Sequence, residues 1–259
     1  MAQDTRVDER MYRPLCGGCD DYQFALVLTS REYGELFSVI LEAEQEGAVT
    51  RTFRRLDPTQ HVAIIDAVLK EMIEVGRQGA TMRGIAHRLG MAAASLYGYF
   101  PDREAMIDFT TSAAARISLL VAADESDVGD SATLEQGLRD HLVTDLDYVA
   151  THWSIIKYYA QAGYRGELPT SQGVLEPIAS GMQSRVQRLL DQAEERGELR
   201  ADLDPDAVSR VVNTLMLVLA DARFVDHLND YLQLYPDDDS SARETIDVAI
   251  DIIARGIGA

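Results

Sequence analysis

Apolar residues recur along this chain at intervals of three and four, which is the spacing of an amphipathic helix. Runs with the strict alternation of a strand are nearly absent, and the seven prolines lie between the helical runs or at their ends. The pattern therefore predicts an all-α fold. The expected helices cover approximately residues 31–46, 61–76, 81–89, 93–99, 102–122, 132–150, 152–162, 173–196, 205–227 and 241–255.

The segment 81–103, TMRGIAHRLGMAAASLYGYFPDR, predicts two short helices joined by a tight turn, with a third helix directly after them. Thr81 is placed to cap the first helix by accepting a backbone N–H. Ile85 and Leu89 are four residues apart and share the apolar face of that helix. Gly90 then stops it. This is the layout of a helix-turn-helix DNA-binding unit.

The segment resembles the DNA-binding half of the TetR (tetracycline repressor) family of bacterial regulators. The family pattern is roughly T-x-R-x-I-A-x-x-L-G-V-S-x-x-x-L-Y-x-H/Y-F-x-x-K-x-x-L. The residues of this chain at those positions are Thr81, Arg83, Ile85, Ala86, Leu89, Gly90, Met91, Ala92, Leu96, Tyr97, Tyr99, Phe100, Arg103 and Met106. The resemblance covers about residues 58–109. It implies a three-helix helix-turn-helix DNA-binding domain, followed by a helical domain for ligand binding and dimerisation.

The resemblance implies that the second helix of the motif is the recognition helix and enters the major groove. The residues that it places near the base edges are Ala93, Ala94, Ser95 and Tyr97. Arg83, on the preceding helix, corresponds to a position that often reaches a base or a phosphate. The recognition helix has no charged or amide side chain, and Ala92 stands where a capping serine is usual. Base readout is therefore expected to depend on Arg83, methyl contacts and DNA shape.

Contacts to the DNA backbone, which fix register without reading sequence directly, are also implied. The residues at these positions are Thr81, Tyr97, Tyr99 and Arg103 in the motif, and Arg51, Arg54 and Arg55 in a basic arm before it. The net charge of the chain is −19, but eight positive and five negative residues give the segment 51–103 a charge of +3. This polarity predicts one face for DNA and an acidic body held away from it. The alternative for the three arginines of the arm is that they are ordinary solvated surface residues that do not contact DNA.

The last two predicted helices contain the sequences VVNTLMLVLA and IDVAIDII. The first is apolar on nearly every side, so it must be buried on all sides. Contact with a partner subunit is the simplest way to bury this helix, and burial in the core of a monomer is the alternative. The resemblance implies a homodimer through these two helices, with two recognition helices set about one DNA turn apart, or further, over a palindromic operator.

Aromatic and histidine residues cluster on the middle helices, and apolar walls with a few polar groups are typical of a small-molecule site. The candidate ligand-binding residues are His141, Tyr148, Trp153, Tyr158, Tyr159 and Met182, with His152, Tyr164 and Val186 nearby. The alternative for each is a plain core position. The resemblance implies that an unknown small-molecule effector releases the DNA, which requires different ligand affinities in the two states.

Residues 1–50 form an N-terminal extension outside the family pattern. Cys16 and Cys19 allow an alternative function, a thiol- or metal-responsive regulator, but zinc needs two more ligands and the chain has no second cysteine pair. Thr29 and Glu32 have the spacing of a capping box. The helix that follows has an apolar stripe that is expected to pack on the DNA-binding domain or on a partner subunit, formed by Tyr33, Leu36, Phe37 and Ile40.

Three segments result: the extension (1–50), the DNA-binding domain (51–109) and the ligand-binding and dimerisation domain (110–259). The common motifs of nucleophilic, metal-dependent and dinucleotide-dependent enzymes are missing from the sequence, so we expect no enzyme, no cofactor and no metal. No apolar run approaches the ~20 residues of a membrane span, and no signal peptide opens the chain, which favours a cytoplasmic protein. The sequence predicts a homodimeric, ligand-responsive transcriptional regulator, a repressor rather than an activator.

Overall fold

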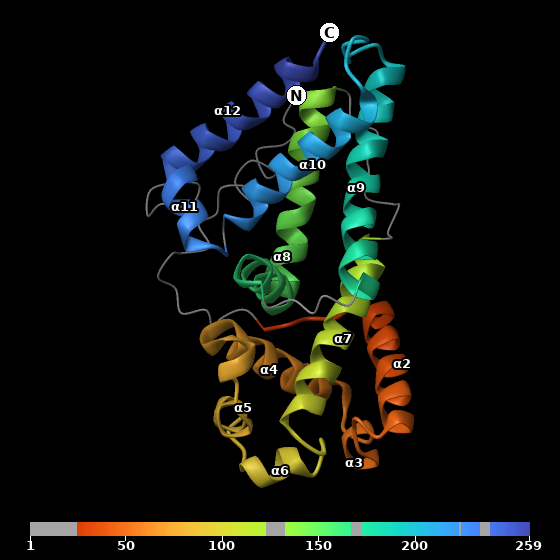
Figure 1. Ribbon diagram of the computed structural model, residues 1–259, viewed down its shortest axis with the longest axis vertical. Coiled ribbons are helices and arrows are strands. Elements are labelled where there is room, and N and C mark those ends of the chain that lie inside the picture. Colours follow the sequence, from red (N-terminus) through yellow and green to blue (C-terminus); the bar gives the residue numbers. More distant parts are fainter. Residues whose placement is uncertain (1–24, 123–132, 167–171, 223, 234–238) are drawn as a thin grey trace, which may run out of the picture. The chain divides into compact units, whose positions relative to one another are not determined.

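The computed structural model describes residues 25–122, 133–166, 172–222, 224–233 and 239–259 (Figure 1). Their regular structure is helical, apart from an isolated antiparallel bridge between Leu199 and Gly258, so the all-α prediction is confirmed. The helices are α2 (Ser30–Glu46), α3 (Arg51–Arg54), α4 (Pro58–Gly79), α5 (Met82–Arg88), α6 (Ala93–Tyr97), α7 (Arg103–Ala122), α8 (Leu134–Arg165), α9 (Gln172–Glu195), α10 (Pro205–Asp221), α11 (Asp226–Leu232) and α12 (Asp239–Ile257).

Three elements differ from the sequence-based prediction. The four-residue helix α3 was not predicted. The predicted helix 205–227 was too long: α10 ends at Asp221, the buried Phe224 follows, and α11 begins as a separate helix. A helix was predicted to end before His152. Instead, α8 continues through this residue with a kink, where the backbone is non-helical (φ −118°, ψ 26°).

The chain packs as two compact units. The first unit contains α2 to α7 together with the second half of α8, and the second unit contains the first half of α8, most of α9, and α10 to α12. The predicted boundaries at residues 50 and 109 divide the chain by role rather than by packing, and they stay a prediction. No helix in the described ranges combines the length and the apolar composition needed to cross a membrane.

Helix α2 is an integral part of the first unit. Its Leu36 and Ile40 are completely buried in the same hydrophobic core as α4 to α7, and Tyr33 and Phe37 pack against that core. The expected packing of the apolar stripe on the DNA-binding domain is thus confirmed. The guanidinium of Arg116 on α7 adds a polar contact, because its Nε donates to Glu35 Oε1 over 2.6 Å.

The predicted capping box starts α2. The Thr29 hydroxyl oxygen accepts the backbone N–H of Glu32 (3.3 Å), and a Glu32 carboxylate oxygen accepts the backbone N–H of Thr29 (2.7 Å). Gly47, with φ 78°, ends the helix in the left-handed conformation that glycine adopts without strain. Two local signals of the sequence therefore set both ends of α2.

An aromatic cluster fills the centre of the first unit. The ring of Phe53, which is completely buried, lies 4.9 Å from His61, 4.8 Å from Phe100 and 5.3 Å from Phe109 between centroids. The His61 ring is held from both sides, since Nε2 is 2.8 Å from the Phe53 carbonyl and Nδ1 is 2.9 Å from the Tyr33 hydroxyl. These contacts join α2, α3, α4 and α7 and support the helices next to them.

Candidate nucleic-acid interface

Helices α5 and α6 form the predicted helix-turn-helix. Thr81 has an extended backbone, and its hydroxyl oxygen accepts the N–H of Gly84 over 3.0 Å, which caps α5 as expected. Gly90, with φ 64°, turns the chain between the two helices. Ala92 begins α6 without a side-chain cap. The recognition helix therefore depends on the packing of Leu96, which is completely buried, rather than on a strong N-terminal cap.

The residues that the sequence placed on the DNA face lie mainly on the outside of these helices. Thr81, Arg83, Ala94, Ser95 and Tyr97 are exposed, Tyr97 to 57%. Ala93 and Tyr99 are half-buried. In contrast, the apolar side of the motif is turned into the core through its buried residues, Ile85, Ala86, Leu96 and Phe100. The motif thus has one face for the core and one for a partner.

The two arginines of α5 differ in their surroundings. Arg83 is exposed and makes no hydrogen bond or ion pair with any described residue. Arg88 is largely buried, and its Nε donates to Glu71 Oε2 on α4 over 2.7 Å. An added Cβ at Gly84 would lie only 1.8 Å from Glu71 Oε1, so this position of α5 must be glycine for the pair to keep its place. Arg88 fixes α5 on α4, and Arg83 is left for a partner.

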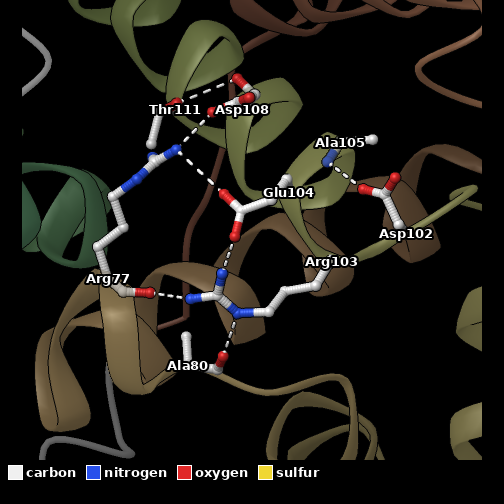
Figure 2. A network of polar contacts seen from close by, with 8 residues as sticks. All are labelled: Arg77, Ala80, Asp102, Arg103, Glu104, Ala105, Asp108 and Thr111. Atoms are coloured by element: carbon white, nitrogen blue, oxygen red, sulfur yellow. Dashed lines mark hydrogen bonds and ion pairs between the residues drawn. The ribbon is translucent and has the colours of Figure 1, made fainter.

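Arg103 has a structural role that the sequence did not predict (Figure 2). Its Nε donates to the carbonyl of Ala80 over 2.5 Å, and its other nitrogens bind the carbonyl of Arg77 and the carboxylate of Glu104. These bonds join the C-terminal end of α4 to the start of α7. Arg103 therefore positions α7 on α4, and its contact with a DNA phosphate stays a prediction.

Arg77 extends this network. Its Nη2 donates to Asp108 Oδ1 over 2.5 Å, as Figure 2 shows. Burial alone would lower the pKa of Arg77, but the hydrogen bond and the negative charge of Asp108 outweigh burial and raise it. The end of α4 is therefore joined to the first turns of α7 by two arginines, Arg77 on α4 and Arg103 on α7.

The segment of the predicted basic arm contains a short helix, because residues 51–54 form α3, and its contact with DNA stays a prediction. Thr50 caps this short helix by accepting the N–H of Phe53 over 3.2 Å, and the burial of Phe53 anchors it. Arg54 forms an ion pair with Glu44 on α2, with 2.6 Å between nitrogen and oxygen. Arg51 and Arg55 are exposed. The three arginines therefore belong to a folded element rather than to an extended segment.

The predicted ligand-binding residues do not lie in one compact unit. Trp153 and Tyr158 are buried in the first unit, where Tyr159 donates its hydroxyl to the carbonyl of Thr111 over 3.0 Å. His141 lies in the second unit. The side chains of Tyr148 and Met182, and residues Cys16 and Cys19, lie outside the part of the chain that is described. Tyr158 and Tyr159 pack on the hydrophobic core shared with α4 and α7. They therefore take the core position that was the alternative to ligand binding.

A cavity of about 220 Å³ lies in the second unit, between α9, the start of α10 and the C-terminal end of the chain. It contains none of the predicted ligand-binding residues. Its lining is mixed, with apolar side chains beside one arginine and two carboxylates, and includes Leu190, Asp191, Glu194, Leu199, Arg200, Val208 and Ile257. Sequence periodicity gave no signal for it, because the lining comes from the ends of several elements.

A family model described as bacterial regulatory proteins of the tetR family matches residues 64–108, from α4 into α7. These residues therefore form a TetR-type DNA-binding domain. The match includes the whole helix-turn-helix, and α2 and α3 precede it. In a TetR-family protein this motif is the DNA-binding element, which agrees with the outward face of α5 and α6.

Two solved structures show the TetR-family fold over most of the chain. A TetR family transcriptional regulator from Chloroflexus aurantiacus J-10-FL is 21% identical, with a TM-score of 0.57 over 82% of this chain and 99% of that one. A protein described under the molecular basis for control of antibiotic production by bacterial hormones is 17% identical, with a TM-score of 0.52 over 79% of this chain and 100% of that one. A comparison with curated proteins gave no match.

Proposed function

We propose that this TetR-family chain is a homodimeric transcriptional repressor that binds a palindromic operator and leaves it when a small-molecule effector binds. The observation that carries the proposal is the outer face of α5 and α6, where Arg83 has no described internal partner and stands on the same motif as Ser95 and Tyr97. An operator is part of the chromosome, so the protein would act in the cytoplasm.

Each exposed side chain of the motif has a distinct proposed task. Arg83 reads a base, since a guanidinium can donate to guanine O6 and N7 together. Ala93, Ala94 and Ser95 approach the base edges of the major groove. The phosphate contacts come from Thr81, Tyr97 and Tyr99, whose hydroxyl groups position the protein without reading sequence. With one arginine as the main reader, DNA shape contributes much of the specificity.

Exposed apolar residues on α10 and α12 support the homodimer. Val211 and Leu215 on α10 are 58% and 44% exposed, and Val248 and Ile252 on α12 are 50% and 63% exposed. Each pair is four residues apart, so each forms a stripe along one side of its helix. An exposed apolar stripe on each of two neighbouring helices marks an interaction surface, and a second copy of this chain fits it by two-fold symmetry.

The effector is proposed to bind to the segment 110–259, which carries the predicted ligand-binding residues. Release of DNA by a ligand needs a bound state that fits the operator less well than the free state does. One similar solved structure is described under the control of antibiotic production by bacterial hormones, which supports control by a chemical signal here.

Selection of DNA from a random pool by the purified full-length chain tests this function. We expect enrichment of one palindromic sequence, with weaker binding at higher salt because bound phosphates release counterions. A pool that yields no palindrome after repeated rounds contradicts the proposal. Enrichment of a single half-site without two-fold symmetry would retain DNA binding but contradict the dimer.

A further inference from the structure

The recognition helix α6 is weakly held by its own sequence. It has five residues, Ala92 precedes it without a side-chain cap, and a helix this short does not persist in isolation. Its completely buried side chain, Leu96, fixes one side of it against the core. The exposed Ser95 and Tyr97 extend from this helix, so their placement depends on contacts from outside it.

Thr50 supplies such a contact where the chain leaves α6. Its backbone N–H donates to the carbonyl of Tyr99 over 2.9 Å, and its hydroxyl donates to the carbonyl of Gly98 over 2.7 Å. These carbonyls lie beyond the last turn of α6, where the helical hydrogen bonds end. Figure 1 shows α3, which begins directly after Thr50, at the same end of the first unit as α6. Two consecutive carbonyls are thus fixed by the two donors of one residue.

Thr50 is itself fixed in place from its other side. Its hydroxyl oxygen accepts the backbone N–H of Phe53 over 3.2 Å, and Phe53 is completely buried, with its ring 4.8 Å from that of Phe100. Val49, the preceding residue, is buried as well. A hydroxyl group can donate to Gly98 and accept from Phe53 at the same time, which a carboxylate cannot do. The contact with α6 is therefore built on the buried core of the first unit.

We propose that Thr50 is a positioning residue for DNA reading, which sets the orientation of α6 by holding the carbonyls of Gly98 and Tyr99. Tyr97 and Tyr99, whose proposed task is to contact phosphates, flank Gly98 directly, so a displacement of this backbone would move both hydroxyl groups. Thr50 precedes the family match at residues 64–108, and it acts through α6 rather than on DNA. The inference rests on the proposed function and deepens it, because it names a residue outside the matched segment on which reading depends.

Operator binding by Thr50→Val and Thr50→Ser tests the inference, with the DNA selected by the wild-type chain as the probe. Valine has nearly the shape of threonine, but it cannot donate to Gly98 or cap α3. We expect Thr50→Val to bind the operator roughly tenfold more weakly, because each subunit of the proposed dimer loses its hydroxyl contacts. Binding to scrambled DNA should change much less, since it depends on charges that the substitution leaves in place. Thr50→Ser keeps the hydroxyl and should bind as the wild type does.

Thr29→Val is the matched control, because the hydroxyl of Thr29 caps α2 as that of Thr50 caps α3, but its partner is Glu32 on the same helix. It should lower the melting temperature without changing the ratio of the affinities for the operator and for scrambled DNA. Hydrogen exchange adds a measurement that needs no DNA. The amides of residues 98–100 should exchange faster in Thr50→Val and at the wild-type rate in Thr29→Val.

An affinity ratio or an exchange rate that is unchanged in Thr50→Val overturns the inference and leaves the proposed function intact. An equal fall of the ratio in Thr29→Val also overturns it, since a general loss of stability would then be the cause. A fall in Thr50→Ser as large as that in Thr50→Val overturns it too, because serine retains the hydroxyl. If the wild-type chain enriches no operator, the proposed function fails and this inference fails with it.

Discussion

A carboxylate oxygen of Glu32 lies 3.1 Å from Nε2 of His152, and both side chains are almost completely buried. Glu32 also completes the capping box of α2, and His152 is the residue at which α8 kinks. The other ring nitrogen of His152 lies 2.8 Å from the hydroxyl of Thr151. One carboxylate thus joins the start of α2 to the kink of a helix more than a hundred residues later.

Glu32→Ala should lower the free energy of unfolding by about 3 kcal/mol, since it removes a helix cap and leaves His152 buried without its carboxylate partner. Urea unfolding followed by circular dichroism measures this. Glu35→Ala is the control, because Glu35 pairs with the more exposed Arg116 and its loss should cost about 1 kcal/mol or less. Equal losses in the two variants would contradict the importance assigned to the buried contact.

His61 should make the first unit less stable as the pH falls. Burial lowers the pKa of His61 below its ordinary value of 6.5, because the charged ring is poorly solvated in the core, and the hydrogen bond to the Phe53 carbonyl and the negative charge of Asp57 offset this only in part. The unfolded chain therefore takes up a proton first. Stability is complete above pH 6.5 and declines as the pH falls below that value towards the lower folded-state pKa.

Melting temperatures between about pH 8 and pH 5.5 test this linkage. His61→Gln should lower the stability at high pH and remove the part of the pH dependence that His61 causes. His87→Gln, at an exposed histidine on α5, should leave the wild-type pH dependence unchanged. A wild-type dependence that persists in His61→Gln would assign the linkage to another group.

Gly84→Ala should separate α5 from α4. Its Cβ would stand 1.8 Å from Glu71 Oε1, so the Glu71–Arg88 pair must break or α5 must move. We expect a loss of about 2 kcal/mol or more in stability, together with weaker operator binding. Gly34→Ala is the control, because nothing lies within 4 Å of its Cβ in α2, and it should stabilise the protein by about 0.5 kcal/mol.

Leu215→Glu and Ile252→Glu should each convert the proposed dimer to a monomer, because each places a carboxylate on an apolar stripe that a second copy is proposed to bury. Sedimentation measures the mass, and operator binding should weaken by at least tenfold as the two half-sites are no longer held together. Val75→Glu, at a similarly exposed valine of the first unit, should leave the mass unchanged. A wild-type chain that sediments as a monomer would remove the basis of this prediction.

Arg83→Ala should weaken binding to the selected operator by about 1–3 kcal/mol if the guanidinium reads a base. Binding to scrambled DNA should change much less, so the specificity ratio falls. Arg200→Ala removes the same charge from a loop of the second unit and should have little effect on either DNA. Equal binding of the operator by Arg83→Ala and wild type would show that Arg83 is not a reader.

The sequence predicted the elements that local signals determine. The caps at Thr29 and Thr81, the glycine turn at Gly90 and the burial of Ile85 were all predicted, because each depends on neighbours within a few residues. Helix periodicity likewise predicted which face of α2 is buried. These local signals were sufficient to place the outer face of the helix-turn-helix.

Contacts between distant residues were not predicted. Thr50 bonds to Gly98 and Tyr99 across almost fifty residues, and neither the spacing nor the residue types indicated that pairing. Arg103 matched a basic position of the family pattern, but a charge alone does not determine its partners, and here backbone carbonyls take its donors. The sequence therefore predicted the exposed face of the motif better than the residues that hold the motif in place.

The burial of α2 has a consequence for how short a piece of this chain can fold. A chain cut to begin at Pro58 would retain the segment that matches the family model, yet it would lose Leu36 and Ile40, which are completely buried in the core. Such a cut would open holes beside α4 and α7, and each lost side chain of this size costs about 2–5 kcal/mol. Helix α2 is thus not a detachable tail, and a fragment meant to fold around the helix-turn-helix has to include it.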